Sequence, residues 1–405
     1  MIGICSVAPI GWFEVLDIHE ELLKLGVRDT LITPEEGVEL MGLSARDDIV
    51  VGWSLKRKLP LYVIDIAKAI VKSRPHVVHV HYEYSLFGSR FKGMFFPVLL
   101  MLIRLLNRAP IIITLHTIIP LDDKSLIKYK SLDSARLLAR LPVPLFRLLL
   151  RAMVRLIDAL SDKLIVGNKL GRDVLTEHYG VAEDRIAVIP FQAVKLYKLA
   201  DVGEVCDHEG EKLVVSYGTV RKDKGFELLI KAFSDVIEQV PNARLIIIGS
   251  VRPHQTTWAY LNKLVRLARE LGVEKNVSFI CSTFVSTDKL HKVFRKASVF
   301  CFPYDEKMVI GSSGAVAEVI TLGKPIVLTK TLMLLEYKDL EGILVFYTSR
   351  KRLSNTLISV LRDLDRIRDR ISSSDVNYFI RHRMPKAIAE KLVKLYIDLL
   401  KRRAR

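Results

Sequence analysis

The sequence predicts an α/β protein built from two domains, and three observations lead to this prediction. Short apolar segments that read as buried strands alternate with helical patterns along most of the chain. A polar stretch at residues 195–212 interrupts this alternation, which then begins again. The length of 405 residues exceeds that of a typical single domain, and 50% of the residues are hydrophobic, enough for two large cores.

The first predicted domain, residues 1–194, is Rossmann-like. A strand leads into a turn with Gly11, where the small residue would let the backbone approach a ligand or simply join the strand to its helix. The expected strands are 2–7, 29–33, 77–81, 111–115, 163–166 and 186–190. Helical patterns are expected to follow at 13–25, 61–73, 91–106, 145–160 and between the last two strands.

The second predicted domain, residues 213–380, repeats the same pattern after the linker. Its expected strands are 213–217, 244–248, 277–281, 299–302 and 326–328. Helices are expected at 226–240, 257–271, 288–297, 312–322 and 351–371. Residues 381–405 are expected to form a final helix with a basic tail.

Charge and composition narrow the classes of function. The formal net charge of +17 predicts an anionic partner, but neither a zinc-finger nor an RNA-recognition pattern occurs, so nucleic acid is not the expected partner. The four cysteines lack metal spacing and are expected to be free thiols in a reducing compartment. No N-terminal signal peptide is visible, and the low glutamine content fits a thermophile.

A basic and apolar region precedes the middle of the chain. The apolar segment 91–106 is too short to span a bilayer. In the next helix Arg147, Arg151 and Arg155 recur every four residues and form one stripe beside apolar neighbours. Such a stripe is either the solvated face of an amphipathic helix or a contact for an anionic membrane surface.

Polar residues follow two strands of the first domain. His81 and Glu83 come at the end of one strand, and His116 follows the next. Ligands of open α/β sheets bind at the carboxyl ends of strands, so these side chains are candidate acceptor or sugar contacts. A histidine titrates near neutrality and could serve as a general base there, although a loop-capping role is equally compatible with the pattern.

The second domain carries a basic turn and a helix that begins with small residues. Arg221 and Lys224 lie in the turn after its first strand, where they are either anion ligands or solvated charges. Helix N-termini stabilise phosphates, and small residues allow close approach. The candidates at this helix are Ser312, Ser313, Gly314 and Glu318.

Taken in order, these segments resemble the glycosyltransferases of family four, which have the GT-B fold. The similar segments are 162–166, 181–190, 217–233, 241–249 and 302–327. The resemblance implies two Rossmann-like domains that face each other across a cleft. It also implies that the C-terminal helices pack back toward the N-terminal domain.

The resemblance also implies roles for particular residues. Arg221 and Lys224 would hold the diphosphate of a nucleotide sugar, and Glu318 would contact its ribose. The first of the family's two glutamates falls at Ile310, so Asp305 and Glu306 are candidates to replace it. His116 would lie near the reacting sugar, and Ser312, Ser313 and Gly314 would face the diphosphate. The implied reaction needs no metal or other cofactor.

The expected function is therefore retaining transfer of a hexose from a nucleotide diphosphate sugar to a glycan or lipid-linked acceptor. The expected location is the cytoplasm, at the inner face of the cell membrane. Two enzymatic alternatives share the fold, a sugar-nucleotide epimerase and a glycosyl phosphorylase. A sugar-nucleotide-binding protein without transferase activity is the non-enzymatic alternative, because Ile310 replaces a glutamate.

Overall fold

The structure is a computed structural model of the chain. It describes residues 2–8, 13–41, 46–54, 61–83, 95–130, 141–191, 210–251, 255–283, 285, 287–305, 310–311, 313–320, 322–337, 344–347, 349–371 and 381–404. The chain divides into two compact units. The N-terminal unit comprises residues 1–192, 308–312 and 382–405, and the C-terminal unit comprises residues 193–307 and 313–381.

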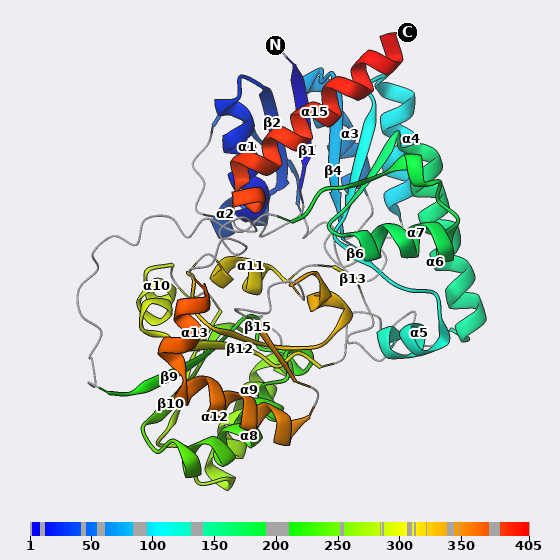
Figure 1. The fold of residues 1–405 in the computed structure, drawn as a ribbon. Helices are drawn as coiled ribbons and strands as arrows, with labels where there is room; N and C mark the ends of the chain where they lie inside the picture. The colour runs from blue at the N-terminus through cyan, green and yellow to red at the C-terminus, as the bar shows by residue number, and fades with distance from the viewer. Residues whose placement is uncertain are drawn as a thin grey trace. The chain divides into compact units, whose positions relative to one another are not determined.

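The N-terminal unit is built on a seven-stranded sheet with the order β3-β2-β1-β4-β5-β7-β8 (Figure 1). Its strands are parallel throughout, as expected for strands joined by helical crossovers. Their bounds are β1 Gly3–Val7, β2 Arg28–Pro34, β3 Ile49–Trp53, β4 Val77–Tyr82, β5 Ile111–Leu115, β7 Lys163–Val166 and β8 Ile186–Val188.

Helices cover both faces of this sheet. The helices of this unit are α1 Phe13–Lys24, α2 Glu35–Met41, α3 Tyr62–Ser73, α4 Phe96–Leu106, α5 Asp123–Lys130, α6 Val143–Leu160, α7 Lys169–Tyr179 and α15 Pro385–Ala404, of which α5 packs against α6. α1 and α15 pack together against apolar residues of β1, β4, β5 and β7. α4 packs against α3 and α6, and the right-handed crossover that is usual between parallel strands places these three helices on the opposite face.

The C-terminal helix belongs to the N-terminal unit, as the resemblance implies. Ile388, Leu392 and Tyr396 of α15 are buried in the core beneath β1. The hydroxyl of Tyr396 also lies 2.7 Å from Nδ1 of His79 in β4. This contact agrees with the usual role of a histidine inside an apolar strand, which is a satisfied core residue.

The C-terminal unit has a six-stranded parallel sheet with the order β11-β10-β9-β12-β14-β15. Its strands are β9 Lys212–Tyr217, β10 Ala243–Ser250, β11 Val277–Ser282, β12 Val299–Phe302, β14 Ile326–Thr329 and β15 Leu344–Tyr347. Its helices are α8 Phe226–Gln239, α9 Gln255–Glu270, α10 Thr287–Lys296, α11 Gly314–Ile320, α12 Arg350–Arg362 and α13 Leu364–Ile371, with short 3-10 turns η5 Lys222–Lys224 and η6 Leu332–Tyr337.

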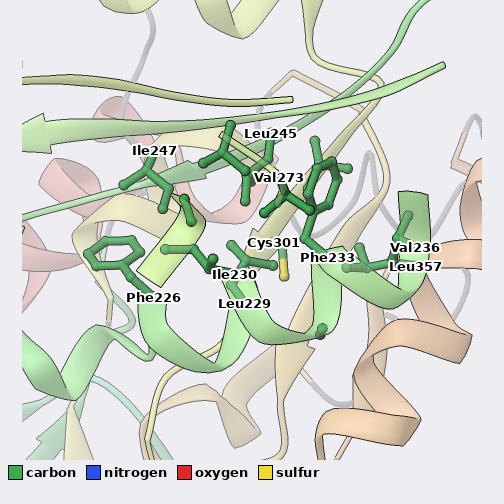
Figure 2. Close-up of a cluster of buried hydrophobic side chains, with 14 of the residues drawn as sticks. Phe226, Leu229, Ile230, Phe233, Val236, Leu245, Ile247, Val273, Cys301 and Leu357 are labelled. Carbon is green, nitrogen blue, oxygen red and sulfur yellow. The ribbon is translucent and has the colours of Figure 1, made fainter. Parts of the chain in front are cut away.

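The core of this unit follows from the sequence of α8. Its apolar residues recur at helical spacing and turn Phe226, Leu229, Ile230 and Phe233 toward the sheet, where all are buried (Figure 2). They pack against strand residues such as Ile247, and Leu357 of α12, which packs beside α8, belongs to the same cluster. The base of this unit is therefore a rigid platform for the turns at its strand ends.

Some elements were not expected from the sequence. No strand or helix was predicted at α2, α5, β3 or β15, or at the two-stranded sheet of β6 Thr117–Ile118 and β13 Ile310–Gly311. Cys5 and Cys301 are buried and Cys281 is half-buried, and all three are free thiols, as expected. In the part of the chain that the structure describes, no helix has the length and hydropathy needed to cross a bilayer.

Candidate functional site

A tightly held turn connects β9 to α8 in the C-terminal unit. Gly218 and Gly225 have φ angles of 144° and 70°, which favour glycine. A Cβ atom on Gly225 would lie 1.7 Å from the carbonyl oxygen of Pro303, and one on Gly249 would lie 1.8 Å from that of Gly218. These glycines therefore let the ends of β9, β10 and β12 approach one another, and they bring the basic turn close to the segment after β12.

Lys224 lies at the centre of this arrangement. Its Nζ atom is 3.9 Å from the centre of the Tyr304 ring, a cation–π contact. The Tyr304 hydroxyl in turn lies 2.8 Å from Oγ of Ser313, the residue before α11. Lys224 and Ser313, predicted separately from the sequence, thus contact the same aromatic side chain.

Arg221 is oriented by a neighbouring carboxylate. Its Nε and Nη2 atoms donate to the two oxygens of Asp223 at 3.0 and 2.7 Å. The Asp223 carbonyl also accepts a bond from the backbone N–H of Asp305 at 3.1 Å. Two of the five guanidinium N–H donors are used in this fork, so the guanidinium is already oriented in the turn.

Glu318 lies one turn into α11 and is half-buried. Burial raises the pKa of its carboxyl to about 7, against the effect of a hydrogen bond from Tyr217 at the end of β9. Burial and the charge of Arg221 together lower the pKa of Lys224 to about 7. A bound anion would restore the charge on Lys224, and a bound hydroxyl donor would favour the ionised form of Glu318.

The histidines of the N-terminal unit form a second cluster. Nδ1 of His81 lies 3.1 Å from Nε2 of His116, and the ring of His79 lies 4.5 Å from that of His81. Burial lowers the pKa of His81 to about 3, and it lowers that of His116 well below its ordinary value with the help of its histidine neighbours. The expectation that His116 titrates near neutrality is therefore wrong, because its neutral ring is the form favoured in this environment.

The loop that carries His116 is held by a short antiparallel pair. Ile310 and Gly311 of β13 pair with Ile118 and Thr117 of β6. A Cβ atom on Gly311 would lie 2.7 Å from the carbonyl oxygen of His116, so only glycine permits this approach. Glu83 accepts a 2.6 Å hydrogen bond from the hydroxyl of Thr117, the residue after His116. The predicted residues Glu83 and His116 are thus linked through the start of β6.

The structure does not describe every predicted residue. Gly11, Glu306 and Ser312 lie outside the described residues. Asp305 is exposed after β12, and Gly314 is exposed at the start of α11. Among the described residues, no group of three His, Cys, Asp or Glu side chains is arranged to hold a metal ion.

Three contributors to the site were missed in the sequence. Tyr304 contacts Lys224, Tyr217 bonds Glu318, and Asp223 orients Arg221. Each has a recognisable signal, because an aromatic residue ends or follows a strand and an acid lies inside a basic turn. Their roles depend on contacts between segments that are far apart in the sequence, except for the contact between Asp223 and Arg221.

Two family matches cover most of the chain. Residues 205–374 match the family described as glycosyl transferases group 1, and residues 15–191 match glycosyltransferase family 4. The chain belongs to the group 1 glycosyltransferases of the GT-B fold. One match covers most of the seven-stranded sheet of the N-terminal unit and the other covers the six-stranded sheet of the C-terminal unit. The two α/β domains of this family therefore account for both sheets.

Individual relatives are distant. Mannosylfructose-phosphate synthase of Agrobacterium fabrum is 30% identical over 147 residues, which are 34% of this chain and 32% of that protein. The D-inositol 3-phosphate glycosyltransferase of Segniliparus rotundus is 25% identical over 268 residues, 64% of this chain and 55% of that protein. The chain thus spans about a third to just over half of the length of these curated relatives.

A solved structure with the same fold holds a nucleotide sugar. The Anabaena protein HepE, crystallised with UDP-glucose, matches with a TM-score of 0.69 over 98% of this chain and 100% of that one. Sequence identity is 14%, so this likeness concerns the fold.

Proposed function

We propose that this glycosyltransferase moves a hexose from a nucleotide diphosphate sugar to a glycan or lipid-linked acceptor, with retention of anomeric configuration. The observation that carries this proposal is the contact of Lys224 with Tyr304, which in turn bonds Ser313. This arrangement gives a half-buried cation beside the small residues that begin α11. The HepE structure with UDP-glucose supports a nucleotide sugar as the ligand of this fold.

The C-terminal unit is proposed to hold the donor. Negative charge grows on the diphosphate as the glycosidic bond breaks, and the fixed charges of Lys224 and Arg221 would stabilise it. Glu318 would accept hydrogen bonds from the ribose hydroxyls. In the N-terminal unit, His116, His81 and Glu83 are proposed as contacts for the acceptor or the transferred sugar. We expect the transfer to need no metal or other cofactor.

The acceptor has a second candidate. Both curated relatives named above have a phosphate in their printed names, which favours a phosphorylated sugar or polyol. The net charge of +17 is compatible with either a phosphorylated small molecule or an anionic lipid. The free thiols of Cys5 and Cys301 fit the proposed cytoplasmic location.

A thermal-shift panel of UDP-, GDP- and ADP-sugars tests the donor assignment. A ligand of the native state raises the melting temperature according to RT ln(1 + [L]/Kd). We expect one nucleotide series to stabilise the protein and Lys224→Ala to abolish the shift. Lys222→Ala, which changes an exposed lysine of the same turn, is the matched control.

Turnover separates the enzyme from its alternatives. Donor hydrolysis or transfer by the wild type and its loss in Lys224→Ala are expected, with the anomeric configuration of the product read by NMR. A stabilising nucleotide sugar without turnover would favour the binding protein, and conversion of the sugar at C2 would favour the epimerase. If no nucleotide sugar changes the melting temperature, the proposed function is wrong.

A further inference from the structure

Large apolar side chains lie exposed on three neighbouring helices of the N-terminal unit. Among the described residues, twelve of the eighteen exposed large apolar side chains belong to α3, α4 or α6 or directly precede one of them. Only Trp258 and Val265 of the eighteen lie in the C-terminal unit. Scattered exposed leucines are ordinary, but a cluster on adjacent helices indicates an interaction surface.

Helix α6 carries apolar residues on two opposite sides. Phe146, Leu150, Val154 and Ile157 are buried and account for its packing on the unit. A second set recurs at helical spacing on the outside and consists of Leu145, Leu148, Leu149 and Leu156, with exposed fractions of 42%, 62%, 39% and 50%. An ordinary surface helix presents polar residues on this side, so the outer leucines are not needed for the core.

Helix α4 repeats the pattern. Its buried residues include Phe96, Leu99 and Ile103, while Val98, Met101 and Leu105 point outward at intervals of three and four residues. Leu105 is 74% exposed, the highest value among these side chains. α4 packs against both α3 and α6, so the three helices lie side by side. We refer to this surface as the α3–α4–α6 face.

The charges at this face are mainly positive. Lys68 and Lys72 of α3 and Arg151 of α6 are exposed. The acids of these helices are Asp65 and Asp158, and Asp158 already accepts from Arg185 at 3.2 Å.

The arginine stripe expected from the sequence is thus partly used inside the unit. Arg147 donates to the Leu121 carbonyl and pairs with Asp123, and Arg155 donates to the Gly180 carbonyl. Arg151, the third arginine of the stripe, is exposed beside the outer leucines.

We propose that the α3–α4–α6 face docks on a bilayer surface that contains anionic lipids, with the helices lying in the plane of the interface. Leucines would enter the region between headgroups and acyl chains, and Lys68, Lys72 and Arg151 would contact lipid phosphates. A second copy of the chain fits less well. A two-fold contact places the same patch on both sides and would bring these like charges together.

Vesicle binding of the full chain tests this inference. We expect sedimentation with vesicles of phosphatidylcholine and phosphatidylglycerol, and about tenfold weaker binding of Leu148→Glu/Leu156→Glu. The matched control is Trp258→Glu/Val265→Glu, which changes exposed apolar residues of the C-terminal unit and is expected to bind as the wild type does. Leu105→Glu, at the most exposed position, is a second variant should the first fail to fold.

The contribution of positive charge to vesicle binding is tested in two ways, with the variant Lys68→Glu/Arg151→Glu and with vesicles of phosphatidylcholine alone. Both changes are expected to weaken binding, as is an increase in salt. The inference is overturned if the wild type does not bind anionic vesicles. It is also overturned if Trp258→Glu/Val265→Glu weakens binding as much as Leu148→Glu/Leu156→Glu does. It is also overturned if Leu148→Glu/Leu156→Glu only converts a dimer to a monomer in sedimentation velocity. The nucleotide-sugar thermal shift is measured on the same samples, so a failure here is distinguishable from a failure of the proposed donor function.

Discussion

Nδ1 of His81 and Nε2 of His116 lie 3.1 Å apart, so one ring donates a hydrogen bond to the other. Both pKa values are lowered by burial, so the pair is expected to remain neutral near pH 7. Behind it, His79 is held by Tyr396 and by Thr114, each at 2.7 Å. His79 packs against the ring of His81 at 4.5 Å between centroids, and His81 in turn contacts His116, so this row of contacts restricts the orientation of the His116 ring.

The first prediction concerns this pair. His81→Phe keeps an aromatic ring but removes the hydrogen bond to His116, and we expect kcat to fall about fivefold, the cost of one hydrogen bond of about 1 kcal/mol. His81→Asn, which can still donate or accept, should retain more activity. Neither ring is expected to titrate between about pH 5.5 and 8, so the histidine pair should contribute no pKa to the wild-type kcat profile in this range. A histidine-like pKa near 6.5 in that profile, lost in His81→Phe, would contradict the neutral pair.

The second prediction follows from Lys224. Burial lowers its pKa to about 7, and an anionic diphosphate favours its charged form. In a Glu318→Gln background, which removes the opposing titration of Glu318, affinity for the nucleotide sugar should therefore be highest below pH 7 and fall by up to about tenfold per unit above it. Calorimetry of this background in two buffers of different ionisation enthalpy should detect proton uptake on binding at pH 7.5.

Lys224→Arg and Lys222→Ala are the comparison variants for this pH dependence. Arginine stays charged throughout, so Lys224→Arg should bind with a flat pH profile. Lys222→Ala should keep the wild-type profile, since this lysine is exposed. An affinity that stays constant from pH 6 to 8.5 in Glu318→Gln would show that Lys224 does not titrate on binding.

The third prediction concerns the stability cost of Glu318. Its pKa of about 7 is above the ordinary value, so the folded state holds the proton more tightly than the unfolded state. The contribution of this group favours folding at low pH and becomes a penalty as pH rises through about 7. Glu318→Gln should therefore stabilise the ligand-free protein by about 2 kcal/mol at pH 8.5 and little at pH 4.5, allowing for partial solvent screening.

Urea denaturation at these two pH values measures the effect, and turnover is measured in parallel. Loss of activity with a gain in stability is the expected combination, because a ribose contact needs the carboxylate. Equal effects of the substitution at both pH values would mean that Glu318 titrates normally in the folded protein.

The fourth prediction addresses Ile310, where the family resemblance places a glutamate. Ile310 is 2% exposed and pairs with Ile118 beside the His116 loop. Ile310→Glu would bury a carboxylate and should cost about 3 kcal/mol or more, whereas Ile310→Val should cost about 1 kcal/mol. Thermal unfolding of both variants provides the measurement. If Ile310→Glu is as stable as the wild type and more active, the position serves the donor after all.

Much of the fold could be predicted because the chain repeats one local pattern. The apolar runs that form β4, β5, β9 and β10 are bounded by turns, and the long helices follow the helical period. Short or mixed segments such as α2 and β13 were missed, since a few residues give no periodic signal and their structure depends on a partner. Residues 308–312 belong to the N-terminal unit although their sequence neighbours belong to the C-terminal unit. This assignment could not be predicted either, because it depends on the pairing of β13 with β6.

By itself, the sequence determined the class of fold, the family and the residues Lys224, Arg221, Glu318 and His116 as candidates. These follow from local patterns, because a strand, a turn and a helix each leave their mark over a few neighbouring residues. Only the tertiary structure decided what those residues contact: Tyr304 beside Lys224, Tyr217 beside Glu318 and His81 beside His116. Such contacts set burial and charge, and burial shifts the pKa values on which the proposed chemistry depends.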